Sequence, residues 1–268
     1  MENGAQVLTY RTADGSVLPI EWHASVPSTA ALAREYARGG YPDRYCILSE
    51  AQTDTSLTGS RLSDGAAERG VFVSCILRPR FFPSQAGPLG ALCAVALASA
   101  LEQHTDRQVD IGWISDIFCE GRRIGGCSLE SRLDAYMAYE YLIVSFGVRV
   151  NDKLFPLRLS DMVKQVFSSD HASAPMRICE SILDRFFHLY RGLQSSHKFL
   201  DDYRRRFIMT GLRVGYQEGE RRLHGRILGI DPEEGRLLVD LGRRGIVKVA
   251  GRARLTLPRR VHRRRRNT

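Results

Sequence analysis

The segment from residue 109 to residue 130 contains the pattern that most restricts how this chain can fold. Two apolar runs, Ile114–Cys119 and Ile124–Leu129, flank a short charged turn that contains Gly121. Runs of this length around a glycine-containing turn predict a β-hairpin.

Two features make this hairpin unusual for a purely structural element. Asp116 lies within the first apolar run, and a buried carboxylate needs a partner, because otherwise its pKa rises until it is neutral. Gly125 and Gly126 leave the second strand without side chains, which weakens a strand unless a ligand or another backbone approaches closely. Two interpretations stay open: a ligand site, or a twisted hairpin with an aspartate at its edge.

Length and charge set broad limits on the fold and the partners. The 268 residues can bury a sizeable core in one large domain or two unequal ones. The formal net charge is +9, and residues 259–268 contain six arginines and no acidic residue. Such a run is typical of a solvated tail, although its charge also permits contact with RNA or acidic lipid.

Cysteines and hydropathy indicate the compartment. The six cysteines show no CxxC spacing, which predicts reduced thiols rather than a disulfide framework or a zinc site. The N-terminus lacks a signal-peptide pattern, and the apolar segment Leu89–Leu101 is shorter than the roughly 20 residues that cross a bilayer. We therefore expect a soluble, cytoplasmic protein with no membrane span.

The order of elements predicts a larger α+β unit followed by a small all-β unit. Strands of the larger unit are expected at Ile20–Ser25, Tyr45–Leu48, Gly70–Leu77 and Tyr139–Val150, and helices from Ser28 and at Leu89–Gln103, Ile178–Leu193 and Lys198–Arg206. Four short strands follow, at Gly211–Tyr216, Arg221–Ile230, Arg236–Leu241 and Gly245–Val249. Their even spacing and turn residues predict a small antiparallel barrel that docks on the larger unit.

Several short motifs occur in an order that is similar to that of a known family. Ser28-Thr29 follow the first strand, Gln52 ends a Glu-x-Gln motif, and Trp113 and Asp116 match the second and last positions of a KWPND motif. Arg122–Gly126 resembles a GRKLAG-type turn, and further matches are Ser74, Gly147 within a GIGIN-type strand, and Phe155-Pro156. With these motifs the chain resembles the biotin protein ligases, in the short form without a DNA-binding domain.

The resemblance implies a fold and a domain organisation. The fold would be α+β, with a mixed β-sheet, helices packed on one side as in class II synthetase-like biotin and lipoate ligases, and a C-terminal SH3-like barrel. The implied domains are an extension over 1–18, a ligase-like domain over 19–206, the barrel over 207–257 and a basic tail over 258–268.

The resemblance also implies an activity and a set of site residues. The family uses ATP to convert biotin to biotinyl-AMP, with Mg²⁺ on the polyphosphate, and transfers biotin to a lysine of a carboxylase carrier domain. Arg123 and Asp116 would be catalytic, with Asp116 as the metal ligand. The implied substrate-binding residues are Ser28, Thr29, Gln52, Arg61, Trp113, Gly125, Gly126 and Gly147. Trp113 and Ser28 also fit structural roles, as a core aromatic and a helix N-cap.

Departures from the family motifs leave the activity open. Of the GRGRRGR loop, which corresponds to residues 55–61, only Arg61 remains, while Gly112 and Arg149 replace a lysine and an asparagine. Losing one well-placed donor costs about 3–4 kcal/mol of transition-state stabilisation, although Arg69, Arg123 and Arg149 could supply charge.

Three functions therefore remain: a working ligase for biotin or lipoate, a catalytically degenerate homologue that binds a small acid or a carrier protein, and a nucleic-acid contact. The last is the weakest, because the barrel has few aromatic residues. Whether the protein is a monomer or a homodimer is also open.

Overall fold

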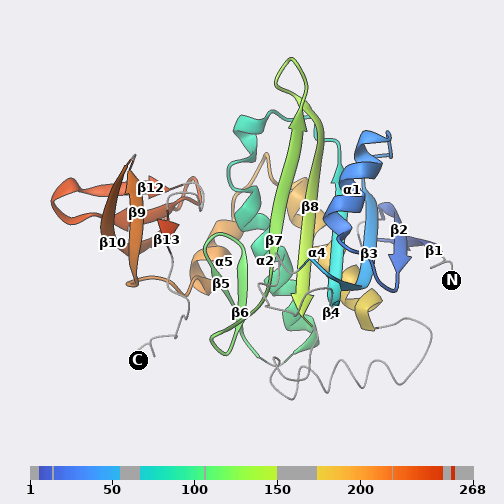
Figure 1. The fold of residues 1–268 in the computed structure, drawn as a ribbon, viewed down its shortest axis with the longest axis horizontal. Helices are drawn as coiled ribbons and strands as arrows, with labels where there is room; N and C mark the ends of the chain where they lie inside the picture. Colours follow the sequence, from blue (N-terminus) through green and yellow to red (C-terminus); the bar gives the residue numbers. More distant parts are fainter. Residues whose placement is uncertain are drawn as a thin grey trace.

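The computed structural model describes residues 6–13, 15–54, 67–105, 107–149, 174–218, 220–249 and 255–256. Within these ranges the chain forms an eight-stranded sheet and a separate five-stranded sheet (Figure 1). In spatial order the larger sheet contains β1 (Gln6–Arg11), β2 (Val17–His23), β3 (Tyr45–Gln52), β4 (Glu68–Leu77), β8 (Tyr139–Arg149), β7 (Arg122–Leu133), β6 (Asp116–Cys119) and β5 (Val109–Gly112).

The pairing of these strands confirms a mixed sheet within an α+β fold. β2 and β3 run parallel and are connected through α1 (Thr29–Arg38), whereas the other neighbours pair antiparallel. β6 and β7 form the hairpin that the apolar runs predict. β1 pairs with β2 along its whole length, so residues 6–11 of the predicted extension are an edge strand of this sheet.

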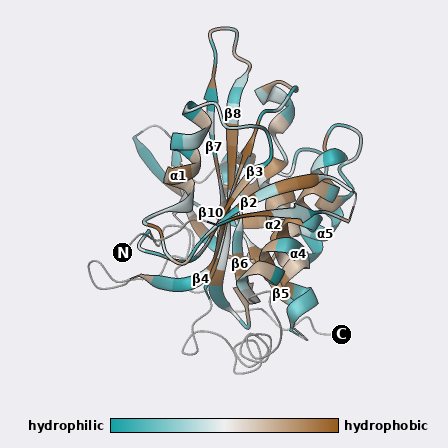
Figure 2. Cartoon of the chain, turned by 90° about the vertical axis from the view of Figure 1, so that its right-hand side faces the viewer, coloured by the Kyte–Doolittle hydropathy of each residue, from teal (hydrophilic) through white to brown (hydrophobic). Residues whose placement is uncertain are grey.

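Helices cover both faces of the sheet, so the expectation that all helices pack on one side is wrong for α1. α2 (Leu89–Leu101), α4 (Ala174–Arg191) and α5 (Phe199–Arg206) belong to the core on one face. α1 packs Ala33 and Ala37 against Ile47, Ile76 and Ile143 on the other face. Successive residues of a strand point to opposite faces of the sheet. Residues of β3, β4 and β8 belong to the cores on both faces, so these central strands are apolar along most of their length (Figure 2).

α2 and its 3₁₀ extensions form a helical run over Pro83–His104 that is long and apolar enough to cross a membrane by length and composition. The helical run begins before the helix expected at Leu89–Gln103 and is longer than the apolar segment Leu89–Leu101. About 72% of its most apolar stretch is buried inside the protein, which is the environment of a core helix.

The second sheet contains the four predicted short strands and one more. In spatial order these are β12 (Ile246–Val249), β11 (Leu237–Asp240), β10 (Arg221–Ile230), β9 (Arg213–Glu218) and β13 (Leu255–Thr256), all antiparallel. Buried side chains of this sheet, among them Val214, Ile227 and Val239, continue the main core. The sheet lies beside α5 and β5 (Figure 1), and the backbone N–H of Ile208 donates to Ile111 O at 3.1 Å.

Candidate functional site

Most of the predicted site residues lie toward one end of the eight-stranded sheet. β3 ends at Gln52 where β4 begins at Glu68, and these two residues are opposite each other. β8 ends at Arg149, which lies opposite Gly70 of β4. Because neighbouring strands are antiparallel here, the end of one strand meets the start of the next. We call Thr29, Gln52, Ser74, Asp116, Arg123, Gly126, Gly147 and Arg149 the sheet-end site.

The first turn of α1 contributes buried polar groups to this site. Ser28 is the N-cap of α1, and its hydroxyl accepts from the Ala31 N–H at 3.4 Å and donates to Asp54 Oδ2 at 3.2 Å. The Thr29 N–H donates to Gln52 Oε1 at 3.3 Å, and the Ser74 hydroxyl donates to Thr29 Oγ1 at 3.0 Å. The structure thus brings together Ser28, Thr29, Gln52 and Ser74, although they lie far apart in the sequence.

Ser145 is a member of this cluster that the sequence motifs do not identify. Its hydroxyl lies 2.8 Å from the hydroxyl of Ser74, directly opposite on β8. Its only signal in the sequence is a polar residue two positions before Gly147, on the same face of a strand.

Two paired glycines leave the neighbouring part of the sheet without side chains. Gly126 of β7 lies opposite Gly147 of β8 on one side and opposite Asp116 of β6 on the other. Gly125 has a different role, because a Cβ there would lie 2.2 Å from the carbonyl oxygen of Gly147. For Gly125, close approach of the neighbouring strand is sufficient to require glycine, and its predicted contact with substrate stays a prediction.

Charged side chains of alternating sign line this end of the sheet. Arg123 donates from Nε to Asp116 Oδ1 at 2.7 Å, and both side chains are largely buried. Arg149 donates to the backbone oxygen of Arg123 and forms an ion pair with Glu68, with 3.8 Å between Nε and Oε1. Burial lowers the pKa of Arg149; the Glu68 carboxylate raises it, and the charge of Arg123 lowers it.

The turn between β5 and β6 is held by hydrogen bonds to other elements. The backbone N–H of Trp113 donates to the sulfur of Met209 at 3.1 Å, the Tyr203 hydroxyl to Ile114 O at 2.7 Å, and the Ser115 hydroxyl to Cys127 O at 2.7 Å. The peptide bond between Trp113 and Ile114 is cis. The three hydrogen bonds hold the turn in place, and with it Asp116, which follows the turn directly in the chain.

Trp113 has the structural role that the sequence left open, since its side chain is fully buried in the main core. Its predicted contact with substrate stays a prediction. At Gly112, where the family motif has lysine, a Cβ would lie 2.7 Å from the Phe118 ring and 3.5 Å from the Met209 sulfur.

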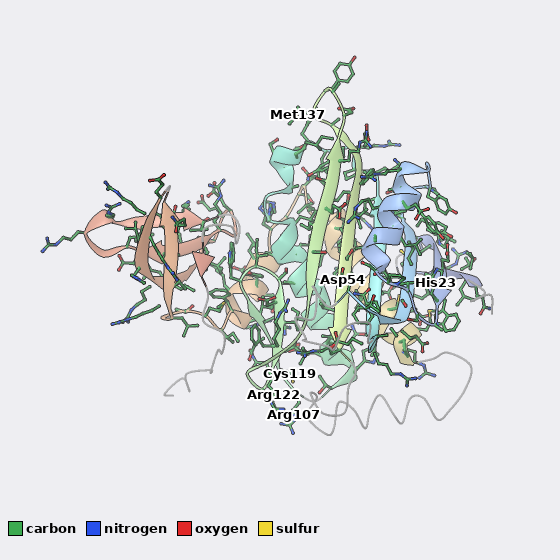
Figure 3. All side chains as sticks on the ribbon, in the orientation of Figure 1. His23, Asp54, Arg107, Cys119, Arg122 and Met137 are labelled. Atoms are coloured by element: carbon green, nitrogen blue, oxygen red, sulfur yellow. The ribbon has the colours of Figure 1, made fainter. Side chains whose placement is uncertain are left out.

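Other predicted features lie outside the described residues: Arg61 and the rest of the loop over 55–61, Phe155-Pro156, and the tail over 258–268. Among the residues that the structure describes, no three His, Cys, Asp or Glu side chains come close enough to hold a metal ion. Figure 3 shows Asp54 beside the start of α1, and Cys119 and Arg122 at the tip of the β6–β7 hairpin.

Comparisons with known proteins agree with this arrangement, although no family model matches the chain. The bifunctional ligase/repressor BirA of Bacillus subtilis (strain 168) is 28% identical over 237 residues, which cover 85% of this chain and 71% of BirA. The apo biotin protein ligase of Aquifex aeolicus superposes with a TM-score of 0.64 at 18% identity, over 90% of this chain and 98% of that chain. The same enzyme in complex with biotin and ATP gives a TM-score of 0.63 with equal coverage.

The architecture of this chain is therefore the fold of the biotin protein ligases. This fold and the similarity to BirA over most of the chain together support a place in the biotin protein ligase family.

Proposed function

We propose that this protein binds biotin and ATP at the sheet-end site, joins them as biotinyl-AMP, and transfers biotin to a lysine of a carboxylase carrier domain. The observation that carries the proposal is the pair of guanidinium groups, Arg123 and Arg149, beside the paired glycines Gly126 and Gly147. Adenylation brings the biotin carboxylate close to the α-phosphate of ATP, and the repulsion between these anions must be offset by preorganised cations and N–H donors.

Each part of the site has a role in this proposal. Ser28, Thr29 and Gln52 would bind the polar groups of biotin, and the bare strand surface at Gly126 and Gly147 would let the ligand approach the backbone. Arg123 would bind the carboxylate and the phosphate with its planar fork, while Asp116 holds that fork in place.

Magnesium has only weak support among the described residues. Asp116 is the single predicted ligand, and its carboxylate already accepts a hydrogen bond from Arg123. We therefore assign Mg²⁺ to the polyphosphate of the incoming nucleotide and route no step through a protein-bound metal ion.

One observation favours a second candidate, a homologue that binds biotin or another small acid, or a carrier protein, without ligation. A side chain at Gly112, the position of the motif lysine, requires displacement of Phe118. The ammonium group of the family motif is missing at this position, and among the described residues of the site Arg123 and Arg149 would have to replace its charge.

The proposal extends to the organisation of the chain. We assign the ligase-like domain to residues 19–206, together with the edge strand β1, and the SH3-like barrel to residues 207–257. The six cysteines are free thiols, which fits a reducing, cytoplasmic compartment. A monomer and a homodimer both agree with this assignment.

Transfer of labelled biotin tests the proposal. The protein is incubated with ATP, Mg²⁺, labelled biotin and a carboxylase carrier domain, and label on the carrier lysine is measured by mass spectrometry. We expect labelling that requires ATP. Absence of label at stoichiometric enzyme would contradict the ligase, and calorimetric binding of biotin in that same sample would favour the second candidate.

A further inference from the structure

Arg149 is an unusual residue for the end of a strand. Its side chain is only 11% exposed, and its Nε has no hydrogen-bond acceptor among the described residues. The Glu68 carboxylate lies 3.8 Å away, which is too long for a hydrogen bond. A buried charged donor without an acceptor is costly, so its retention calls for an explanation.

The backbone around Arg149 places its side chain on the face of the sheet that carries the rest of the site. Ser145, Gly147 and Arg149 alternate along β8 and therefore point to the same face, and Ser145 contacts Ser74 there. Gly70 lies directly opposite, and a Cβ at that position would lie 2.2 Å from Val148 O. The added Cβ would also lie 3.1 Å from the Phe72 ring, so glycine at this position lets β4 and β8 approach each other closely beside Arg149.

The neighbours of Arg149 compensate its charge only in part. One terminal nitrogen of Arg149 is committed to the backbone oxygen of Arg123, whose own guanidinium group is nearby. Burial and the charge of Arg123 both disfavour a second cation here, and the Glu68 carboxylate compensates only in part. An arginine stays protonated in proteins, so an anion that lies beside both guanidinium groups would relieve their repulsion.

We propose that Arg149 binds the phosphate of the nucleotide and of the acyl-adenylate, and that the Glu68 carboxylate forms an ion pair with Arg149 when no nucleotide is bound. This inference rests on the proposed function. The family motif has asparagine at the position of Arg149, and the loop over 55–61 keeps a single arginine of its motif. The inference assigns to Arg149 part of the anion binding that this loop has lost.

Calorimetry with matched charged and neutral ligands tests the proposal on the full chain. ATP and adenosine differ in the phosphates alone, and biotin is measured separately. We expect Arg149→Gln to weaken ATP binding at least tenfold while adenosine and biotin change less than twofold. Arg132→Gln removes an exposed arginine on β7 that pairs with Glu140, and serves as the matched control with unchanged affinities.

The Glu68→Gln variant tests whether Arg149 binds a ligand or only forms a structural ion pair with Glu68. Loss of this carboxylate frees Arg149 and removes a repelling charge, so we expect ATP to bind severalfold more tightly. A structural pair predicts a lower melting temperature with no gain in ATP affinity, and that result would overturn the proposal. The Arg149→Lys variant, which keeps the charge, serves where Arg149→Gln fails to fold, and we expect it to lose part of the ATP affinity.

The outcomes distinguish this inference from the proposed function. If the wild-type protein binds neither biotin nor ATP, the proposed function fails and the inference fails with it. If it binds both, but Arg149→Gln and Arg149→Lys retain full ATP affinity, only the inference about Arg149 is wrong.

Discussion

At the scale of single residues, backbone approach explains a glycine that looks functional in the sequence. A Cβ on Gly125 would lie 2.2 Å from Gly147 O and 3.1 Å from the Val148 Cα, so β7 and β8 would have to separate. We expect Gly125→Ala to lower the free energy of unfolding by about 2 kcal/mol, measured by urea denaturation. Gly87→Ala, where the added Cβ has open space, serves as the control, and equal stability of the two variants would contradict this reason for glycine.

The buried carboxylate of Glu21 gives the protein a pH-dependent contribution to stability. Burial alone would raise the pKa of Glu21, but hydrogen bonds from Tyr45, Tyr36 and His23 lower it below its ordinary value. Because the folded state then holds this proton less tightly than the unfolded state, the contribution is present above the ordinary pKa and is lost as the pH falls through the folded pKa. We expect the stability difference between wild type and Glu21→Gln to shrink from pH 7 to pH 3.

Urea denaturation at several pH values measures this difference. Glu35→Gln on α1 is the control, because Glu35 is exposed to solvent. A Glu21→Gln difference that stays constant between pH 7 and pH 3 would contradict the role of the carboxylate.

Sequence patterns predict residues whose role is local and fail where the role depends on a distant strand. The N-cap Ser28 is recognisable because a cap and its helix are neighbours in the chain. The contact between Ser145 and Ser74 depends on the register between strands, which local composition does not specify. The same holds for Gly125, where the register decides between backbone approach and ligand contact.

At the scale of elements, α5 holds the turn that precedes Asp116. The Tyr203 hydroxyl donates to Ile114 O at 2.7 Å, and the Tyr203 side chain is fully buried. Tyr203→Phe leaves this carbonyl without its donor, and we expect it to lower the free energy of unfolding by about 1–2 kcal/mol and to weaken biotin binding. Tyr136→Phe, on the exposed loop between β7 and β8, is the control in calorimetry and denaturation, and the same behaviour in both variants would contradict this role of α5.

The elements themselves follow closely from the sequence, because periodicity and turn residues specify them locally. The β6–β7 hairpin and α2 lie where the apolar runs predict. The position of α1 on the opposite face could not be predicted in this way. Both faces of β3, β4 and β8 are apolar, so the pattern does not indicate which helix covers which face.

At the scale of the whole molecule, the two sheets share one continuous core. Val214, Ile227 and Val239 of the second sheet belong to the same buried cluster as α2 and the main sheet. The Gly235 backbone also lies close to Leu200 of α5, where an added Cβ would come within 2.9 Å. We therefore expect a single cooperative transition in differential scanning calorimetry, with equal calorimetric and van't Hoff enthalpies. Two separate transitions would show that the sheets fold independently.

The most direct test of the central claim is the exchange of labelled pyrophosphate into ATP, which reports adenylate formation without any carrier protein. We predict exchange that requires biotin in the wild-type protein and in Arg132→Ala, and its loss in Arg123→Ala although this variant remains folded. Exchange at the wild-type rate in folded Arg123→Ala, or no exchange in a wild-type protein that binds both biotin and ATP, would contradict the account.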